Sequence, residues 1–217
     1  MPVLLMRLEG PMQSWGTYSR FSERDTGLEP SKSGVIGLIC SAMGRERGED
    51  VSDLSSLRMA VRIDREGRYS NDYHTAINVP RAGSKGTDTS LSNRYYLADA
   101  SFVVFIEGEA DLLHSIQAAL DNPKHCVFLG RKSFPPSTPI LMPGGLKSGT
   151  IEENIRRIPL SSRDSERKPE RVRVVMECSI GEGEMKMDVP ISFQDRDFIQ
   201  RYVKTLWVDI KDLPEGC

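Results

Sequence analysis

The order of apolar segments along the chain is the feature that most limits its fold. Short apolar runs indicate buried strands, and longer segments with apolar residues every three or four positions indicate helices. The predicted elements lie at residues 3–8, 31–43, 59–63, 101–106, 111–120 and 126–129. Their order is strand, helix, strand, strand, helix, strand, which is the order of a ferredoxin-like split β-α-β sheet. The sequence therefore predicts an α+β, ferredoxin-like (RRM-like) domain.

Two further regions lie outside this pattern. Glu66 and Gly67 predict a hairpin turn into a strand at residues 68–75, and residues 76–93 then show almost no apolar periodicity. An irregular stretch of that length inside a compact domain is usually functional. The last part of the chain predicts strands, which are expected at residues 171–180, 184–189 and 202–210. We expect a ferredoxin-like domain at residues 1–145 and a β-rich, antiparallel C-terminal extension at residues 146–217, packed on the same domain.

The overall charge gives no indication of a nucleic-acid partner. The 217 residues include 29 basic and 31 acidic side chains, so any affinity for RNA must come from local clusters of cations. The four cysteines form no C-x-x-C pair, and no metal site or cofactor is expected. No leader and no membrane span is predicted, so a reduced, cytoplasmic location is the expectation.

The loop after the first strand combines aromatic, amide and guanidinium groups. Stacking aromatics beside cations are typical of proteins that bind single-stranded nucleic acid. The alternative for Trp15 is that it plugs the core above the sheet, since tryptophan is highly buried on average. The candidate RNA-binding residues of this loop are Gln13, Ser14, Trp15, Arg20, Phe21 and Arg24.

The start of the first helix offers groups that suit a phosphate. Lys32, Ser33 and Gly34 open the helix with free backbone N–H groups, a hydroxyl and a cation. The segment lacks the glycine that a P-loop requires before its lysine, which argues against nucleotide hydrolysis. A plain capped helix start is the alternative for this segment.

Further candidates follow later strands. His74 is the histidine best placed for acid–base chemistry, although a hydrogen-bonded strand residue is the more ordinary role. Arg94 and Tyr95 close the long insertion and again place a cation beside an aromatic ring. Arg131 and Lys132 follow Gly130, where a flexible backbone can approach a ligand closely.

Five stretches, in this order, resemble a known family. They are the segments RLEGPMQSWG at 7–16, KSGVIGL at 32–38, DYHT at 72–75, YLADASF at 96–102 and LGRKS at 129–133. Together they are similar to the Cas5 (CasD) subunits of type I-E CRISPR Cascade complexes. The resemblance spans about two-thirds of the chain and is less distinct over the last seventy or so residues.

The resemblance implies a fold and a function. Members have a RAMP-type, ferredoxin-like body, and residues 76–93 would form its protruding β-hairpin thumb, which here carries Arg81 and Lys85. Such a subunit is not catalytic and binds the 5′ handle of the crRNA. It packs against the Cas7 backbone subunit and the large PAM-reading subunit, and it meets target DNA through the assembled complex. Contacts with the handle are expected in the 13–15 and 20–24 segments, at residues 32–34, and near His74, Arg94 and Arg131.

Two competing functions remain open. The related type I-C Cas5 proteins cut RNA, so the chain could be a metal-independent endoribonuclease that processes repeat RNA. His74 would then serve as the acid or base, with Lys32 or Lys85 stabilising the charged transition state. A generic RRM-like protein that binds RNA on its own is the third possibility.

Overall fold

The computed structural model describes residues 1–16, 22–81, 83, 85–160 and 169–214. Within them, one large antiparallel sheet contains seven strands in the order β10-β11-β9-β4-β7-β1-β8. The elements of the N-terminal part are β1 (Val3–Glu9), β2 (Met12–Gln13), β3 (Glu23–Arg24), α1 (Lys32–Met43), α2 (Ser52–Ser55), β4 (Arg58–Arg65), β5 (Arg68–Pro80), β6 (Thr87–Ala98), β7 (Ser101–Glu107) and α3 (Ala110–Asp121). Those of the C-terminal part are β8 (Leu141–Lys147), α4 (Ile151–Arg157), β9 (Arg171–Cys178), β10 (Glu184–Ser192), β11 (Asp197–Asp209) and the 3₁₀ helix η1 (Ile210–Asp212).

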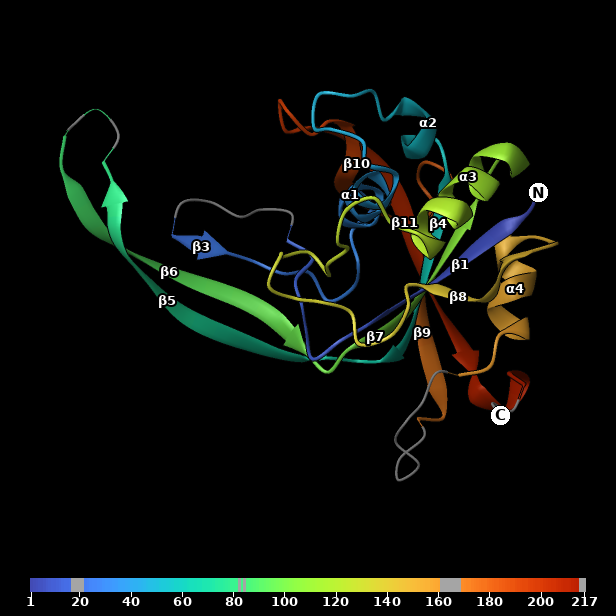
Figure 1. The fold of residues 1–217 in the computed structure, drawn as a ribbon. Coiled ribbons are helices and arrows are strands. Elements are labelled where there is room, and N and C mark those ends of the chain that lie inside the picture. The colour runs from blue at the N-terminus through green and yellow to red at the C-terminus, as the bar shows by residue number, and fades with distance from the viewer. Residues whose placement is uncertain (17–21, 82, 84, 161–168, 215–217) are drawn as a thin grey trace.

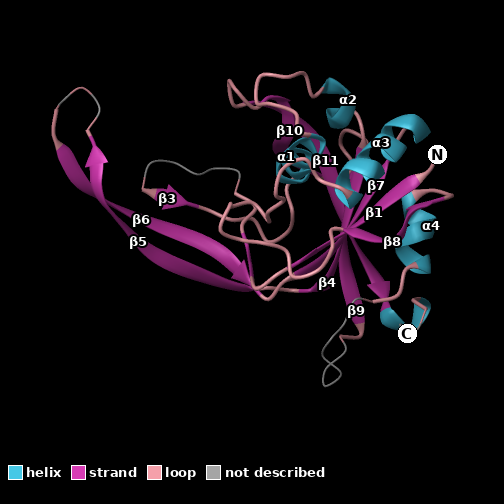
Figure 2. Cartoon of the chain, viewed as in Figure 1, coloured by secondary structure: helices cyan, strands magenta, loops and turns pink. Residues whose placement is uncertain are grey.

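The ferredoxin-like core is confirmed. Four strands, in the order β8-β1-β7-β4, form the split β-α-β sheet, and the connections after β1 and β7 carry the helices α1 and α3. These helices cover one face, where Ile39 packs in the same buried cluster as Leu113 and Ile116. Helix α4 covers the other face through Ile151 and Ile155 (Figures 1 and 2). None of the helices in the described part of the chain combines the length and apolar character needed to cross a membrane.

The fourth core strand lies later in the sequence than predicted. Residues 126–129 form no strand, because Leu129 is buried within a loop that is held by backbone hydrogen bonds to Ser14 and Phe134. The strand is β8, which the proline-rich sequence concealed. Pro143 is tolerated because β8 is an edge strand, where a missing N–H removes no ladder hydrogen bond.

The predicted C-terminal strands are confirmed as β9, β10 and β11. They continue the core sheet, because β9 pairs with β4 and β11 pairs with β9. Strand β4 therefore has partners on both sides and cannot form the predicted hairpin with β5. The chain instead leaves the sheet at Gly67, where an added Cβ would lie 2.8 Å from the Cβ of Ala100.

The insertion is a long two-stranded hairpin that projects from the sheet (Figure 1). Strands β5 and β6 pair from Arg68 and Ala98 at the base to Pro80 and Thr87 near the tip. The hairpin is thus longer than the irregular region at 76–93 that the sequence suggested. Most side chains of β5 are exposed, which explains why the apolar pattern is absent. Short strands β2 and β3 flank β6 and form a second sheet with it.

Candidate nucleic-acid interface

Three arginines from separate segments converge beside the base of the hairpin. Strand β3 runs parallel to β6 and places Arg24 next to Arg94. Arg131, from the loop before β8, donates from Nη2 to the backbone oxygen of Arg24 at 3.2 Å and to that of Tyr95 at 2.8 Å. We refer to Arg24, Arg94 and Arg131 as the arginine cluster.

Charges of both signs surround Arg131 in the arginine cluster. Burial lowers the pKa of Arg131, and the charges of Arg94 and Arg24 lower it further, while Asp72 acts in the opposite direction. Among the described residues, no carboxylate lies within ion-pair distance of the three guanidinium groups. Arg94 donates to the Ser92 hydroxyl at 3.1 Å. Guanidinium groups without a carboxylate partner are suited to bind phosphate oxygens.

Ser14 and Gly130 build the support for this cluster. The Ser14 hydroxyl lies within hydrogen-bonding distance of the backbone oxygens of Asp25, at 3.4 Å, and Tyr95, at 3.3 Å. Gly130 has φ +89°, and an added Cβ there would lie only 1.7 Å from the Ser14 oxygen. Gly130 therefore allows two loops of the protein to lie close together. The sequence had suggested instead that it allows a ligand to approach the backbone.

Gln13 and Trp15 lie inside the protein. Gln13 is fully buried, and its amide nitrogen donates to the backbone oxygens of Leu8, at 3.1 Å, and Ala100, at 2.8 Å. Its side-chain oxygen accepts from Trp15 Nε1 at 3.2 Å. The predicted contact of these two side chains with RNA is corrected, because all their polar groups have protein partners and Trp15 plugs the core.

The N–H group and the charge at the start of α1 have carboxylate partners in the protein itself. The backbone N–H of Lys32 donates to Asp188 at 2.8 Å, and its ammonium group pairs with Glu177 at 3.0 Å. Ser31 caps the helix by accepting from the N–H of Gly34. An added Cβ on Gly34 would lie 2.8 Å from the Trp15 ring, so this glycine allows the indole to pack. The phosphate site predicted at Lys32, Ser33 and Gly34 is therefore corrected, because a protein carboxylate already holds the position of the anion.

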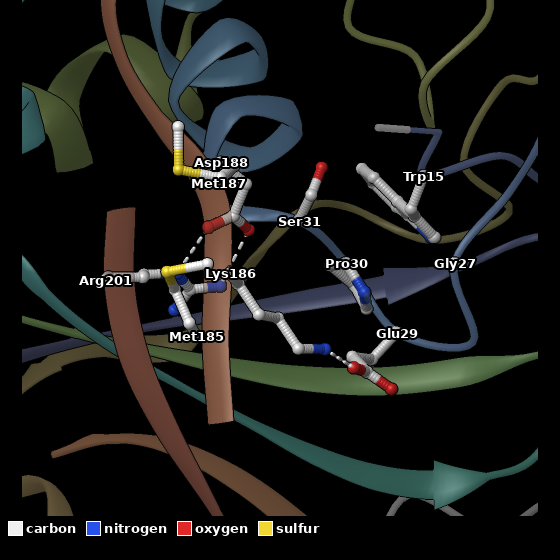
Figure 3. A pocket seen from close by; sticks show the side chains of 10 residues that line it. All are labelled: Trp15, Gly27, Glu29, Pro30, Ser31, Met185, Lys186, Met187, Asp188 and Arg201. Atoms are coloured by element: carbon white, nitrogen blue, oxygen red, sulfur yellow. Dashed lines mark hydrogen bonds and ion pairs between the residues drawn. The ribbon is translucent and has the colours of Figure 1, made fainter. Parts of the chain in front are cut away.

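A pocket of about 220 Å³ lies beside this helix start (Figure 3). Its charged side chains are paired: Lys186 with Glu29, and Arg201 with Asp188 at 2.6 Å. Burial alone would raise the pKa of Asp188, but the hydrogen bonds and charge of Arg201 outweigh burial and hold that pKa below its usual value. The full lining consists of Trp15, Gly27, Glu29, Pro30, Ser31, Met185, Lys186, Met187, Asp188 and Arg201.

The remaining candidates lie on the hairpin and nearby loops. His74 is half-buried in the middle of β5, opposite Ser92, and no described residue hydrogen-bonds to its ring. Lys132 and Lys85 are exposed, and Arg81 pairs with Asp88 at 2.9 Å. Arg20 and Phe21 lie outside the described residues. No group of three metal-binding side chains occurs within the described part of the chain.

The comparisons with known proteins identify the family. The family model for the Cas5 CRISPR-associated proteins matches residues 3–208. The chain belongs to the Cas5 family.

Other Cas5-related proteins agree with this assignment. The Cascade subunit CasD of Escherichia coli K12 is 35% identical over 156 residues, which cover 64% of this chain and 69% of CasD. A crystal structure of a Cas protein matches with a TM-score of 0.83 and 41% identity, over 99% of this chain and 98% of that one. A chain of a CRISPR RNA-guided surveillance complex matches with a TM-score of 0.84 and 32% identity, over 96% and 90%.

Sequence reasoning missed the partner of the predicted residue Tyr95 and a polar contact beside it in this Cas5 chain. The ring of Tyr95 stacks on Tyr69, with centroids 5.3 Å apart, and Asn71 donates to Asn93 at 3.1 Å between neighbouring positions. The sequence signal for these contacts was the alternation of side chains expected for a strand at residues 68–75, which places Tyr69 and Asn71 on the same face. The register of β5 against β6 was needed to show which side chains meet.

Proposed function

We propose that this Cas5 chain is a non-catalytic, crRNA-binding subunit of a type I-E CRISPR surveillance complex. It holds the 5′ handle of the guide RNA and supports assembly and target DNA recognition in antiviral defence. Its protein neighbours are the Cas7 backbone subunit and the large PAM-reading subunit. The observation that carries the proposal is the arginine cluster, which forms no ion pair with a described carboxylate and lies beside the projecting hairpin of a Cas5 fold.

The arrangement supports binding of RNA without cleavage. Lys32, one of the two lysines considered for transition-state stabilisation, is 4% exposed and is held by Glu177. No described residue forms a hydrogen bond that would orient the ring of His74. A positioned acid or base normally needs such a partner, so binding is the function that these residues favour.

Co-purification tests the RNA-binding role. The tagged chain is co-expressed with the other subunits and a repeat-spacer transcript, and complexes are recovered through the tag. We expect a large complex with one guide RNA from the native chain. Replacing Arg24, Arg94 and Arg131 with alanine should reduce the RNA in the complex at least tenfold, since each charge-assisted hydrogen bond contributes about 1.5 kcal/mol or more.

The matched control is Arg171→Ala. Arg171 pairs with Asp209 at 2.7 Å, away from the cluster, so its loss should leave the RNA content unchanged. Equal RNA recovery from the native chain and the triple variant would contradict the proposal.

A cleavage assay tests the non-catalytic role. The isolated chain is incubated with repeat RNA in the presence of EDTA, beside the His74→Ala variant. We expect intact RNA in both samples. Specific cleavage by the native chain that disappears in the variant would identify an endoribonuclease and overturn the non-catalytic role.

A further inference from the structure

Ser14 lies between the three segments that carry the arginine cluster. Its backbone N–H donates to the oxygen of Leu129 at 3.1 Å, in the loop that leads to Arg131. Its hydroxyl lies 3.3 Å from the backbone oxygen of Tyr95 on β6 and 3.4 Å from that of Asp25, which follows β3. The segment after β2 therefore contacts all three parts of the chain from which the arginines project.

Trp15 and Thr26 connect this segment to the residues that follow β3. The backbone N–H of Trp15 donates to the Thr26 hydroxyl oxygen at 2.9 Å, and the N–H of Gly27 donates to the Trp15 oxygen at 3.0 Å. The Thr26 hydroxyl donates in turn to the oxygen of Gly27 at 2.9 Å. We call these three hydrogen bonds the clasp. Without the hydroxyl, the buried N–H of Trp15 would lose its acceptor, which is costly.

The position of Arg24 depends on the clasp more than the positions of the other two arginines do. Strand β3 has only two residues and pairs with β6 at two positions, whereas strands are usually longer. Arg94 lies within the long pairing of β5 with β6, and Arg131 donates to the oxygen of Tyr95 on that same ladder. Thr26 is two positions after Arg24, so the clasp holds the chain close to this arginine.

We propose that Thr26 is a positioning residue of the RNA-binding site and that it acts through Arg24. Thr26 is 8% exposed and its hydroxyl is used within the protein, so it holds the arginine in place without contacting RNA. A guanidinium group that is ordered in advance loses less conformational entropy on binding, which raises affinity. This role rests on the proposed function for RNA as the ligand. It assigns Trp15 to the placing of a cation, where the sequence predicted contact with RNA.

A double-mutant cycle on the full chain tests this role. Thr26→Val keeps the shape of the side chain and removes the hydroxyl. The affinity for labelled single-stranded RNA is measured by fluorescence anisotropy, with and without Arg24→Ala. Thr26→Val alone should weaken binding about threefold, and Arg24→Ala alone about fivefold or more. The double variant should bind as Arg24→Ala does, because the clasp then has no guanidinium group to position.

The outcomes separate the positioning role from the RNA-binding function. Native affinity of Thr26→Val, beside a weakened Arg24→Ala, would overturn the positioning role and leave the RNA-binding function supported. Native affinity of Arg24→Ala would overturn the contact of Arg24 with RNA, and the positioning role with it. An equal loss from Thr26→Val in both backgrounds would indicate a general structural defect and overturn action through Arg24.

A conservative variant and a matched control complete the cycle. Thr26→Ser keeps the hydroxyl and should bind RNA as the native chain does, whereas a loss equal to that of Thr26→Val would contradict a role for the hydroxyl. Thr205→Val makes the same substitution at an exposed position of β11 and should leave RNA affinity unchanged. A loss of affinity from this control as large as that from Thr26→Val would also contradict the positioning role.

A second variant tests the same segment if Thr26→Val does not fold. Ser14→Ala removes the hydroxyl beside the oxygen of Asp25 and leaves the clasp in place. Binding of RNA should weaken about twofold in the native background, and the loss should be smaller beside Arg24→Ala. A loss of the same size in both backgrounds would contradict positioning through Arg24.

Discussion

Two groups of cations in this molecule have opposite surroundings. At the start of α1 and along β10 and β11, every charged side chain lining the pocket has an opposite charge beside it. At the base of the hairpin, the hydrogen bonds and ring contact of the three guanidinium groups with described residues are to backbone oxygens, a hydroxyl and an aromatic ring, while Asp72 and Asp25 act on Arg131 only through longer-range charge. We call the first group the carboxylate-paired group: Lys32, Lys186 and Arg201 with Glu29, Glu177 and Asp188.

Burial explains the difference. A cation taken out of water needs a carboxylate partner, because the loss of hydration is otherwise too costly. The cations of the arginine cluster keep contact with solvent and can remain unpaired. The near-zero net charge of the chain thus conceals a local excess, since many of its carboxylates serve internal pairs.

The largest expected effect comes from breaking the carboxylate-paired group. Asp188 is 2% exposed, accepts from Nε and Nη2 of Arg201 and receives the first N–H of α1. Asp188→Ala leaves the Arg201 guanidinium buried without its main partner, so the free energy of unfolding should fall by about 3–5 kcal/mol. Urea unfolding of the full chain measures the change.

The matched control is Asp88→Ala, which breaks the exposed pair with Arg81 near the hairpin tip. Its cost should stay within about 1 kcal/mol. A similar small cost for Asp188→Ala would show that the two groups of cations do not differ as described.

The second effect concerns RNA and the arginine cluster. Arg24→Ala combined with Arg94→Ala should weaken the binding of single-stranded RNA by about tenfold or more, whatever the RNA sequence. The slope of log affinity against log salt should fall by about 1.4, or about 0.7 for each lost phosphate contact. Fluorescence anisotropy of labelled RNA over a salt series measures both. An unchanged slope would mean that these arginines do not contact phosphate.

Local pattern was sufficient to predict most of the fold. The helix at α3 and the buried strands β1, β4 and β7 were predicted because their apolar spacing is strong. Strand β8 was not, since prolines in a sequence normally argue against a strand and only its place at the sheet edge permits one. The path of β5 away from β4 depended on β9, which comes more than a hundred residues later.

The residue types of the candidate site could be predicted from the sequence, but the contacts of their side chains could not. Arg24, Arg94 and Arg131 were all among the candidates that the sequence predicted, and their convergence was visible only once β3 was seen to pair with β6. Lys32 was predicted to bind phosphate, but Asp188 accepts the hydrogen bond from its backbone N–H. The sequence does not indicate this contact, because Asp188 is 156 positions away. No local pattern carries that information.

The third effect is a dependence of stability on pH that only the carboxylate-paired group should show. Burial would raise the pKa of Asp188 and Glu29, but their cationic partners outweigh burial and lower both. A carboxyl group with a lowered pKa in the folded state stabilises the fold above its unfolded pKa of about 4. That stabilisation is lost as the pH falls through the lower folded value.

Unfolding free energies from pH 7 down to pH 3 test this expectation. The native chain should lose stability below about pH 4, and Asp188→Asn should show a shallower loss over the same window. Identical pH profiles for the native chain and the variant would contradict the role of the Asp188 charge.

The smallest expected effect comes from a substitution that keeps the charge of Arg131 but changes the shape of its side chain. Arg131→Lys keeps the cation but loses the fork that reaches the oxygens of Arg24 and Tyr95, as well as the contact 5.4 Å above the Phe134 ring. The salt slope of RNA binding should therefore stay the same, while the affinity falls by roughly two- to fivefold because the cluster is less well ordered. If the lysine variant binds as tightly as the native chain, charge alone explains Arg131. If the affinity of the lysine variant falls as far as that of Arg131→Ala, the position of the guanidinium group matters as much as its charge. Backbone oxygens hold that position in this cluster, whereas carboxylates hold the cations of the carboxylate-paired group.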